Sequence, residues 1–294
     1  MSRETLAFMF VLAGCVLAFF HESLLGGKIL SPADVLLVEA SFRPLAGPEF
    51  EPRNRLLMDP VLQFQPWLEF NRAMIREGRL PLWNPYAGCG VPHLANGQRA
   101  VFDPFNFLAY ATTVSGSLVW MAAARLWVAG LGAYLLAKAW RCEFWGRWFA
   151  GLSYPFCGFL VVWLLYPVTP VAIWLPWLLL ASNRVIERPG ARAAGLLAIV
   201  VALLIFGGHI QTSAHALLAS ALFAAWKLRD FSNAVCSRRK AFAAWAGGTI
   251  LGLLIASVQI FPLGVYLTKS PVWGDRQRET KAWWSLARPR LLDA

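Results

Sequence analysis

The chain has 294 residues, of which 58% are hydrophobic and 15% charged, and it contains 15 tryptophans. Soluble globular chains carry about 25% charged residues, so the 27 basic and 16 acidic side chains of this chain represent a marked shortage of charge. This composition excludes a secreted disulfide scaffold, a disordered tail and a soluble nucleotide-binding enzyme.

Four long runs of the chain carry no charged residue, at 6–20, 148–183, 193–226 and 241–268. A helix needs about 20 mostly apolar residues to span the hydrocarbon core of a bilayer. The sequence therefore predicts an all-α polytopic membrane protein.

The first transmembrane helix is expected within residues 1–25. It is interpreted as an uncleaved span because no small-x-small cleavage site follows it. Residues 26–116 then form one large polar loop, and residues 117–267 form a six-helix transmembrane bundle. The tail at 268–294 is expected to be a truncated continuation towards a further span.

The six later spans follow from the turn formers. One span covers 117–137, and one covers 241 to about 266. The run at 148–183 is too long for a single crossing at about 1.5 Å per residue, and Pro167 and Pro170 favour a turn near its middle. The run at 193–226 breaks in the same way at 207–209, so the prediction is about seven spans.

Basic residues set the expected orientation. The three loops at 138–147, 184–192 and 227–240 hold 11 Lys plus Arg, whereas the loop at 26–116 holds 8 basic and 8 acidic residues. By the positive-inside rule the N-terminus and the three basic loops are cytoplasmic and the large loop is extracytoplasmic. Topology thus accounts for most of the net charge of +11, and a nucleic-acid partner is not needed.

The large loop is predicted to contain amphipathic interfacial helices. A helix is expected over residues 61–77, with Asp59 as its N-cap, Pro60 at its first position and Gly78 as its stop signal. Its tryptophan, Trp67, would lie at the level of the lipid headgroups.

The stretch at 78–105 mixes turn formers with aromatic and amide side chains. Such side chains bind sugars well, because a pyranose offers an apolar face and hydroxyl groups. A compact cap, in which the same side chains satisfy the backbone, explains the composition equally well. The residues concerned are Trp83, Asn84, Tyr86, His93, Asn96 and Gln98.

Three segments of the loop carry a family resemblance: DPVLQFQPW at 59–67, GRLPLWNPYAGCGVP at 78–92 and ANGQRAVF at 95–102. Together with GGHIQT at 207–212, WLPW at 174–177 and QIFP at 259–262, they resemble the YfhO-type bacterial membrane proteins. The resemblance covers essentially the whole chain, and PLWNPYxxxGxP is its most specific element. Members of that family are usually longer, so the chain resembles an N-terminal portion.

The resemblance implies a C-type glycosyltransferase of the bacterial inner (cytoplasmic) membrane. Such an enzyme takes a sugar from a polyprenyl-phosphate-linked donor and transfers it to a cell-envelope glycan or lipid acceptor outside the membrane. The expected base is a carboxylate in the first outer loop, which takes the proton of the acceptor hydroxyl. Asp59 is the first choice for the catalytic residue and Asp34 the second, ahead of Glu22 and Asp103.

Candidate substrate-binding residues are of two kinds. Arginines pair bidentately with phosphate oxygens, while amides, aromatics and histidines of the matched motifs contact the sugar. Arg125 lies inside a span, where an unpaired charge is costly, so it is expected to be paired, to reach a lipid phosphate or to snorkel to the surface. The full set is Gln63, Arg72, Trp83, Asn84, His93, Asn96, Gln98, Arg99, Arg125, His209 and Gln211.

Each of these roles has a structural alternative. Asp59 can simply cap a helix, Arg72 and Arg76 can face headgroups, and His209 can bond between helices. No cluster has metal-ligand spacing, so no metal site is predicted, although a divalent cation held by Asp59 is compatible with the sequence. A polytopic transporter or lipid flippase, or a non-catalytic membrane scaffold, is the alternative to the glycosyltransferase.

Overall fold

The computed structural model describes residues 2–47, 49–229, 237–270, 274–275 and 278. This part of the chain is mostly helical, as expected, and its strands form a single two-residue hairpin, β1 (Trp83–Asn84) with β2 (Val91–Pro92). Most of the tail predicted at 268–294 lies outside the described residues.

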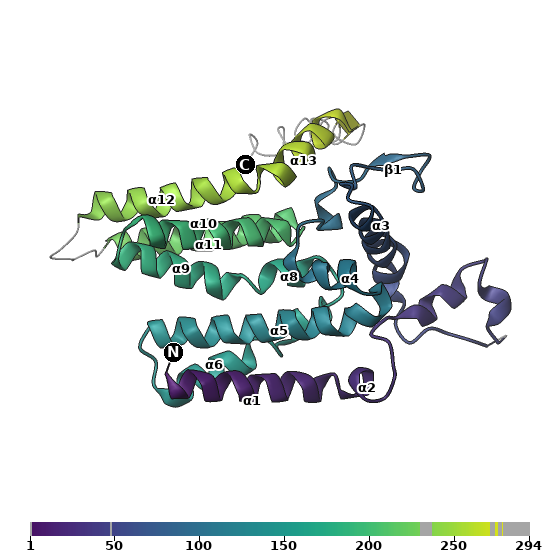
Figure 1. The fold of residues 1–294 in the computed structure, drawn as a ribbon, viewed down its shortest axis with the longest axis horizontal. Coiled ribbons are helices and arrows are strands. Elements are labelled where there is room, and N and C mark those ends of the chain that lie inside the picture. Colours follow the sequence, from purple (N-terminus) through teal and green to yellow (C-terminus); the bar gives the residue numbers. More distant parts are fainter. Residues whose placement is uncertain (1, 48, 230–236, 271–273, 276–277, 279–294) are drawn as a thin grey trace, which may run out of the picture.

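The longer helices lie roughly parallel to one another along the long axis of the molecule (Figure 1). They are α1 (Arg3–Phe19), α5 (Val114–Ala139), α6 (Phe144–Ser153), α9 (Leu175–Glu187), α10 (Ala191–Phe206), α11 (Ile210–Arg229) and α12 (Arg238–Ile255). The N-terminus and the α9–α10 connection lie at one end of this bundle, and the segment between α1 and α5 lies at the other (Figure 1).

The predicted helix breaks occur where proline and glycine interrupt the apolar runs. Helix α7 (Gly158–Val162) ends before Pro167, and α8 (Val168–Ala172) begins after it. Helix α10 ends at Phe206, and α11 begins at Ile210 after the Gly207-Gly208 turn, in which Gly208 has a φ of 94°. Both breaks were expected from the sequence and are confirmed.

The segment between α1 and α5 consists of short elements. They are α2 (His21–Leu24), η1 (Ala33–Val38), η2 (Arg43–Leu45), η3 (Arg55–Leu57), η4 (Pro60–Phe64), α3 (Gln65–Arg76), the β hairpin, η5 (Gly97–Arg99), η6 (Pro104–Asn106) and α4 (Phe107–Ala111). The helix predicted at 61–77 is present as the π-helical turn η4 followed by α3. It ends at Arg76, two residues before Gly78, whose φ is 70°.

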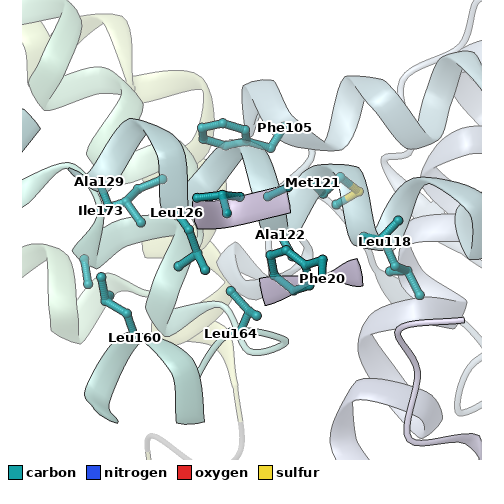
Figure 2. Packing of buried hydrophobic residues seen from close by; sticks show 14 of the residues in the cluster. Phe20, Phe105, Leu118, Met121, Ala122, Leu126, Ala129, Leu160, Leu164 and Ile173 are labelled. Carbon is teal, nitrogen blue, oxygen red and sulfur yellow. The ribbon is translucent and has the colours of Figure 1, made fainter. Parts of the chain in front are cut away.

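One hydrophobic core holds α1, α5 and α6 together. Phe8 and Leu12 of α1 are fully buried, and the ring of Phe8 stacks on Tyr134 of α5 with 4.1 Å between the centroids. A Cβ on Gly151 of α6 would lie 2.3 Å from the Phe8 ring, so only glycine allows this close approach. Figure 2 shows the continuation of this core around Leu126, Leu160 and Ile173.

A second core joins α9, α10 and α12. Gly248 and Gly252 of α12 face the backbone of α10, where added Cβ atoms would lie 2.8 Å and 2.6 Å from the carbonyl oxygens of Ala194 and Ala198. Small residues at one-turn spacing thus bring the two helices into backbone contact, as is common between helices in membranes.

The structure contains helices that are suitable for crossing a membrane. Among the described residues two are long and apolar enough, Val114–Ala139 and Val168–Glu187, where the second combines α8 and α9. Helices α12 and α13 (Ser257–Lys269), bent by 68°, could add a third as one broken span. The seven spans expected from the sequence remain a prediction.

Candidate functional site

A cavity of about 70 Å³ lies between the segment that precedes α5 and the helical bundle. Its walls come from η4 and α3, η5, α5, and the α7–α8 connection. The polar or aromatic side chains that line it are Phe64, Gln65, Trp67, Gln98, Arg99, Asn106, Arg125 and Tyr166. Of the predicted site residues, three reach this cavity: Gln98, Arg99 and Arg125.

Arg99 is held in the cavity wall by a short capped turn. The side chain of Asn96 accepts a hydrogen bond from the backbone N–H of Gln98 at 3.1 Å and so caps η5, which Arg99 ends. The Nη1 atom of Arg99 donates to the carbonyl oxygen of Pro92 at 2.6 Å, and the guanidinium lies 5.1 Å from the ring centroid of Trp67.

The charge of Arg99 is not neutralised by any carboxylate among the described residues. The side chain is only 6% exposed, and its buried Nε atom has no acceptor. Burial lowers the pKa of Arg99 to about 10, so the group still carries its charge at neutral pH. A buried guanidinium without an ionic partner is costly unless an anion binds it, and two oxygens of a phosphate group can accept bidentate bonds from its planar fork.

Arg125 is paired within the protein. Its Nη2 atom lies 2.7 Å from Oδ2 of Asp103 and donates to Oδ1 of Asn106 at 3.0 Å. Burial raises the pKa of the Asp103 carboxyl, and the adjacent guanidinium opposes that rise. Arg125 is therefore paired, rather than free to reach a lipid phosphate or to snorkel to the surface. Its partner, Asp103, is one of the weaker candidates for the catalytic base in the sequence.

Asp59 immediately precedes Pro60, which lines the cavity, but Asp59 is not itself a lining residue and does not cap a helix. Its backbone is helical, with φ −56° and ψ −41°, and its side chain makes no capping bond, so the predicted N-cap role is wrong. Residues 58 and 59 already continue the helical turn that precedes η4. The exposed carboxylate instead accepts a hydrogen bond from Nε2 of Gln63 at 2.8 Å through Oδ1.

Tyr166 lies in the cavity wall and is close enough to Asp59 to be affected by its charge. The tyrosine lines the cavity, and its pKa is raised by burial and by the charge of Asp59. Pro60, the next residue after Asp59, also lines the cavity. The carboxylate therefore lies near two lining residues of the cavity and remains accessible to solvent.

Asp34 has a structural bond and does not line the cavity. Its Oδ2 atom accepts a hydrogen bond from the backbone N–H of Arg53 at 2.9 Å, which fixes η1 against the proline-rich segment.

Arg72 and Arg76 both bind backbone carbonyl groups near the end of α4. Arg72 donates from Nε to the carbonyl oxygen of Thr112 and forms an ion pair with Glu69 at 2.9 Å. Arg76 donates to the carbonyl oxygens of Tyr110 and Ala111. Both arginines thus satisfy carbonyl groups at the end of α4, and neither faces the cavity.

Two of the predicted sugar-binding residues are buried in the hairpin region. His93 is fully buried, its Nε2 atom lies 2.7 Å from Oδ1 of Asn71, and burial lowers its pKa to about 3. Asn71 in turn donates to the carbonyl oxygen of Arg99 at 2.9 Å. Asn84 is 5% exposed and accepts from the backbone N–H of Tyr86. These contacts match the compact-cap interpretation.

Trp83 is the accessible aromatic residue of the hairpin, with 54% of its surface exposed. Its ring covers Gly90, where a Cβ would lie 2.6 Å from the indole and where φ is 108°. Trp83 is therefore available to a ligand, but it does not line the cavity.

His209 caps α11 through its ring. Its Nδ1 atom accepts a hydrogen bond from the backbone N–H of Thr212 at 3.3 Å and lies 2.7 Å from the Thr212 hydroxyl. Desolvation lowers its pKa. Gln211 is exposed. The neighbouring Gly207, rather than either of these residues, lines the cavity.

Segments far apart in the sequence meet at this cavity. A Cβ on Gly208 would lie 2.7 Å from the carbonyl oxygen of Gly97, so the α10–α11 turn packs directly on η5. From α13, Gln259 donates to the carbonyl oxygen of Leu94 at 2.9 Å and is 2% exposed. The segments at 95–102, 207–212 and 259–262 are therefore neighbours in space.

Sequence reasoning missed several residues of the cavity. Gln65, Asn106 and Tyr166 all line it. Gln65 belongs to the segment at 59–67 that carries the family resemblance, and this membership could have identified it as a site residue. Tyr166 immediately precedes a helix-breaking proline, which had been interpreted only as a turn signal.

Comparison with known proteins adds nothing to this description, since no family model, no curated protein and no solved structure matches the chain. The described residues also contain no group of three or more His, Cys, Asp or Glu side chains that could hold a metal ion. The chemistry of the cavity is thus inferred from its own side chains.

Proposed function

We propose that this chain is a C-type membrane glycosyltransferase that uses a polyprenyl-phosphate-linked sugar. The observation that carries this proposal is the buried, unneutralised guanidinium of Arg99 in the wall of the cavity. The resemblance to YfhO-type proteins supports the same class. The acceptor is a cell-envelope glycan or lipid.

The size of the cavity favours a phosphate group over a whole sugar. Small-molecule pockets typically enclose about 300 to 1,000 Å³, whereas this cavity has about 70 Å³. The donor phosphate would therefore bind inside, next to Arg99. The sugar would lie outside the cavity, next to the exposed side chains of Gln98 and Asp59.

The transfer step follows from this arrangement. The acceptor hydroxyl attacks the anomeric carbon, and the free Oδ2 of Asp59 takes its proton. The bond from the anomeric carbon to the phosphate oxygen breaks, and the electron pair leaves with the polyprenyl phosphate. Arg99 stabilises the negative charge on that leaving phosphate. Asp34 is the second candidate for the base.

The proposed topology places the chemistry on the outer face of the bacterial inner membrane. Seven spans, a cytoplasmic N-terminus and an extracytoplasmic segment at 26–116 satisfy the positive-inside rule. The separation of the two ends in Figure 1 supports this orientation, because the basic α9–α10 connection lies opposite the cavity-bearing segment.

The test is transfer of radiolabelled sugar by the full chain in proteoliposomes. Asp59→Asn is expected to abolish transfer while donor binding is retained, and Asp34→Asn is expected to leave transfer intact. Transfer at the wild-type rate by both variants would show that neither carboxylate is the base. Glu69→Gln, on the exposed side of α3, is the matched control.

A lipid flippase or other transporter is the second candidate. The 68° bend between α12 and α13 favours it, since broken helices often line transport sites. Movement of a labelled sugar lipid across the bilayer without transfer would select this function. If the chain binds the donor but neither transfers the sugar nor moves the sugar lipid across the bilayer, a non-catalytic scaffold would be favoured.

A further inference from the structure

A second pocket lies at the end of the bundle opposite the candidate site. It has a volume of about 650 Å³ and is enclosed by α5, α9 and α10. This volume is within the range of small-molecule and lipid sites. The pocket shares no lining residue with the cavity around Arg99.

The pocket has a charged opening and an apolar wall. Arg184, Arg188 and Arg192 line it, are all exposed, and have no acidic partner among the described residues. Glu187, the acidic residue of this lining, is paired with Lys227 at 3.2 Å. The local charge therefore remains strongly positive.

The start of α10 adds backbone donors to the same opening. Its N-cap is Gly190, which lines the pocket and provides no side-chain cap for the first N–H groups of the helix. Uncapped N–H groups at a helix N-terminus, together with the helix dipole, favour an anion.

The inner wall contains one buried polar group without a partner. Asn183 is 1% exposed, lines the pocket, and its Oδ1 atom has no hydrogen-bond partner in the described part of the chain. Buried amides normally have hydrogen-bond partners. The unpartnered oxygen of Asn183 therefore indicates that a polar ligand binds here.

The apolar wall continues along the outside of α10. Leu196 and Ile199 line the pocket and are 46% and 53% exposed, on a helix without a charged residue beyond its first turn. The pocket is thus continuous with a surface that suits an acyl chain.

We infer that this pocket binds one anionic glycerophospholipid of the surrounding bilayer. Arg184, Arg188 and Arg192 hold the phosphate together with the start of α10. Asn183 bonds to the glycerol region, and one acyl chain lies along Leu196 and Ile199. Basic pockets between helices are suited to anionic headgroups. The site is independent of the proposed transferase activity.

The test is native mass spectrometry of the full chain, titrated with phosphatidylglycerol or phosphatidylcholine. One phosphatidylglycerol is expected to bind in preference to phosphatidylcholine. Each arginine near an anionic lipid contributes about fivefold in affinity, so Arg184→Gln, Arg188→Gln and Arg192→Gln combined should weaken that binding by more than about tenfold.

A matched triple variant controls for total charge. Arg3, Arg239 and Lys240 are also exposed near helix starts outside the pocket, and their replacement by Gln should leave the preference unchanged. An equal loss in both triple variants, or no preference in the wild type, would overturn the proposal.

The apolar wall is tested separately. Leu196→Gln with Ile199→Gln should weaken phosphatidylglycerol binding without changing charge, whereas Leu218→Gln with Leu222→Gln, on the exposed face of α11, should not. Inorganic phosphate should fail to displace the lipid. Displacement by millimolar phosphate would show that the pocket recognises a free anion instead.

Discussion

The Nη2 atom of Arg125 lies 2.7 Å from the Oδ2 atom of Asp103, and both side chains are buried. Arg125 comes from the middle of α5, and Asp103 comes from the segment that precedes this helix. The ion pair thus connects the cavity-bearing segment to the bundle. Asn106 completes the arrangement by accepting a second bond from the same nitrogen.

Breaking this pair should destabilise the protein strongly. Asp103→Asn keeps an acceptor for the backbone N–H of Phe105 but leaves the Arg125 charge buried and unpaired, which costs about 3 to 5 kcal/mol. Thermal unfolding in detergent measures this loss. Adding Arg125→Met should recover part of it, and equal melting temperatures for the wild type and Asp103→Asn would contradict the account.

His93 should make stability depend on pH. Burial lowers its folded pKa to about 3 from an ordinary value of 6.5, so the unfolded chain binds the proton more readily. The stabilisation is complete above pH 6.5 and is lost as the pH falls towards 3, by about 2 kcal/mol at pH 5. His93→Gln should flatten the fall in melting temperature between pH 7 and pH 5. An unchanged slope would exclude His93 as its source.

The contact between Gly208 and η5 should tolerate no side chain. Gly208→Ala places a Cβ 2.7 Å from the carbonyl oxygen of Gly97 at a φ of 94°, and we expect a loss of more than about 1 kcal/mol. Gly195→Ala is the control, because that position lies in α10 with open space around it. Its alanine should stabilise the helix. Equal melting temperatures for the two variants would show that the contact is unimportant.

Cysteine labelling tests the orientation. Cys89 and Cys142 are both exposed, and they lie in the hairpin segment and the α5–α6 connection, at opposite ends of the bundle (Figure 1). In single-cysteine variants, an impermeant maleimide should label Cys89 in intact spheroplasts and Cys142 only in inverted vesicles. The reverse pattern would overturn the proposed topology.

Local features of the fold were predictable from the sequence. The expected helix breaks occur at Pro167, between α7 and α8, and at Gly207-Gly208, between α10 and α11, whereas Pro170 lies inside α8. Gly78 follows the end of a helix because glycine adopts a positive φ readily. The π turn at η4 was not predicted, because its pattern resembles that of an ordinary helix start, and Asp59 was consequently misassigned as a cap.

Pairings between distant residues were not predictable in the same way. The bond from Gln259 to Leu94 joins positions 165 residues apart, and no local pattern specifies it. The sequence did indicate that Arg125 needs a partner or a wet site, since a buried charge is costly, but it could not choose Asp103. Similarly, Arg72 and Arg99 looked alike in the sequence, and only their surroundings separate a backbone-binding arginine from one that faces a cavity.

The central claim is that Arg99 binds the phosphate of a sugar-lipid donor. Equilibrium binding of radiolabelled polyprenyl-phosphate-linked sugar to the full chain in nanodiscs tests it most directly. Arg99→Gln should weaken binding by about tenfold or more, since a charge-assisted hydrogen bond contributes about 1.5 to 3 kcal/mol. Arg79→Gln, which alters an exposed arginine paired with Glu77, should bind as the wild type does. Wild-type affinity in a folded Arg99→Gln variant would contradict the account.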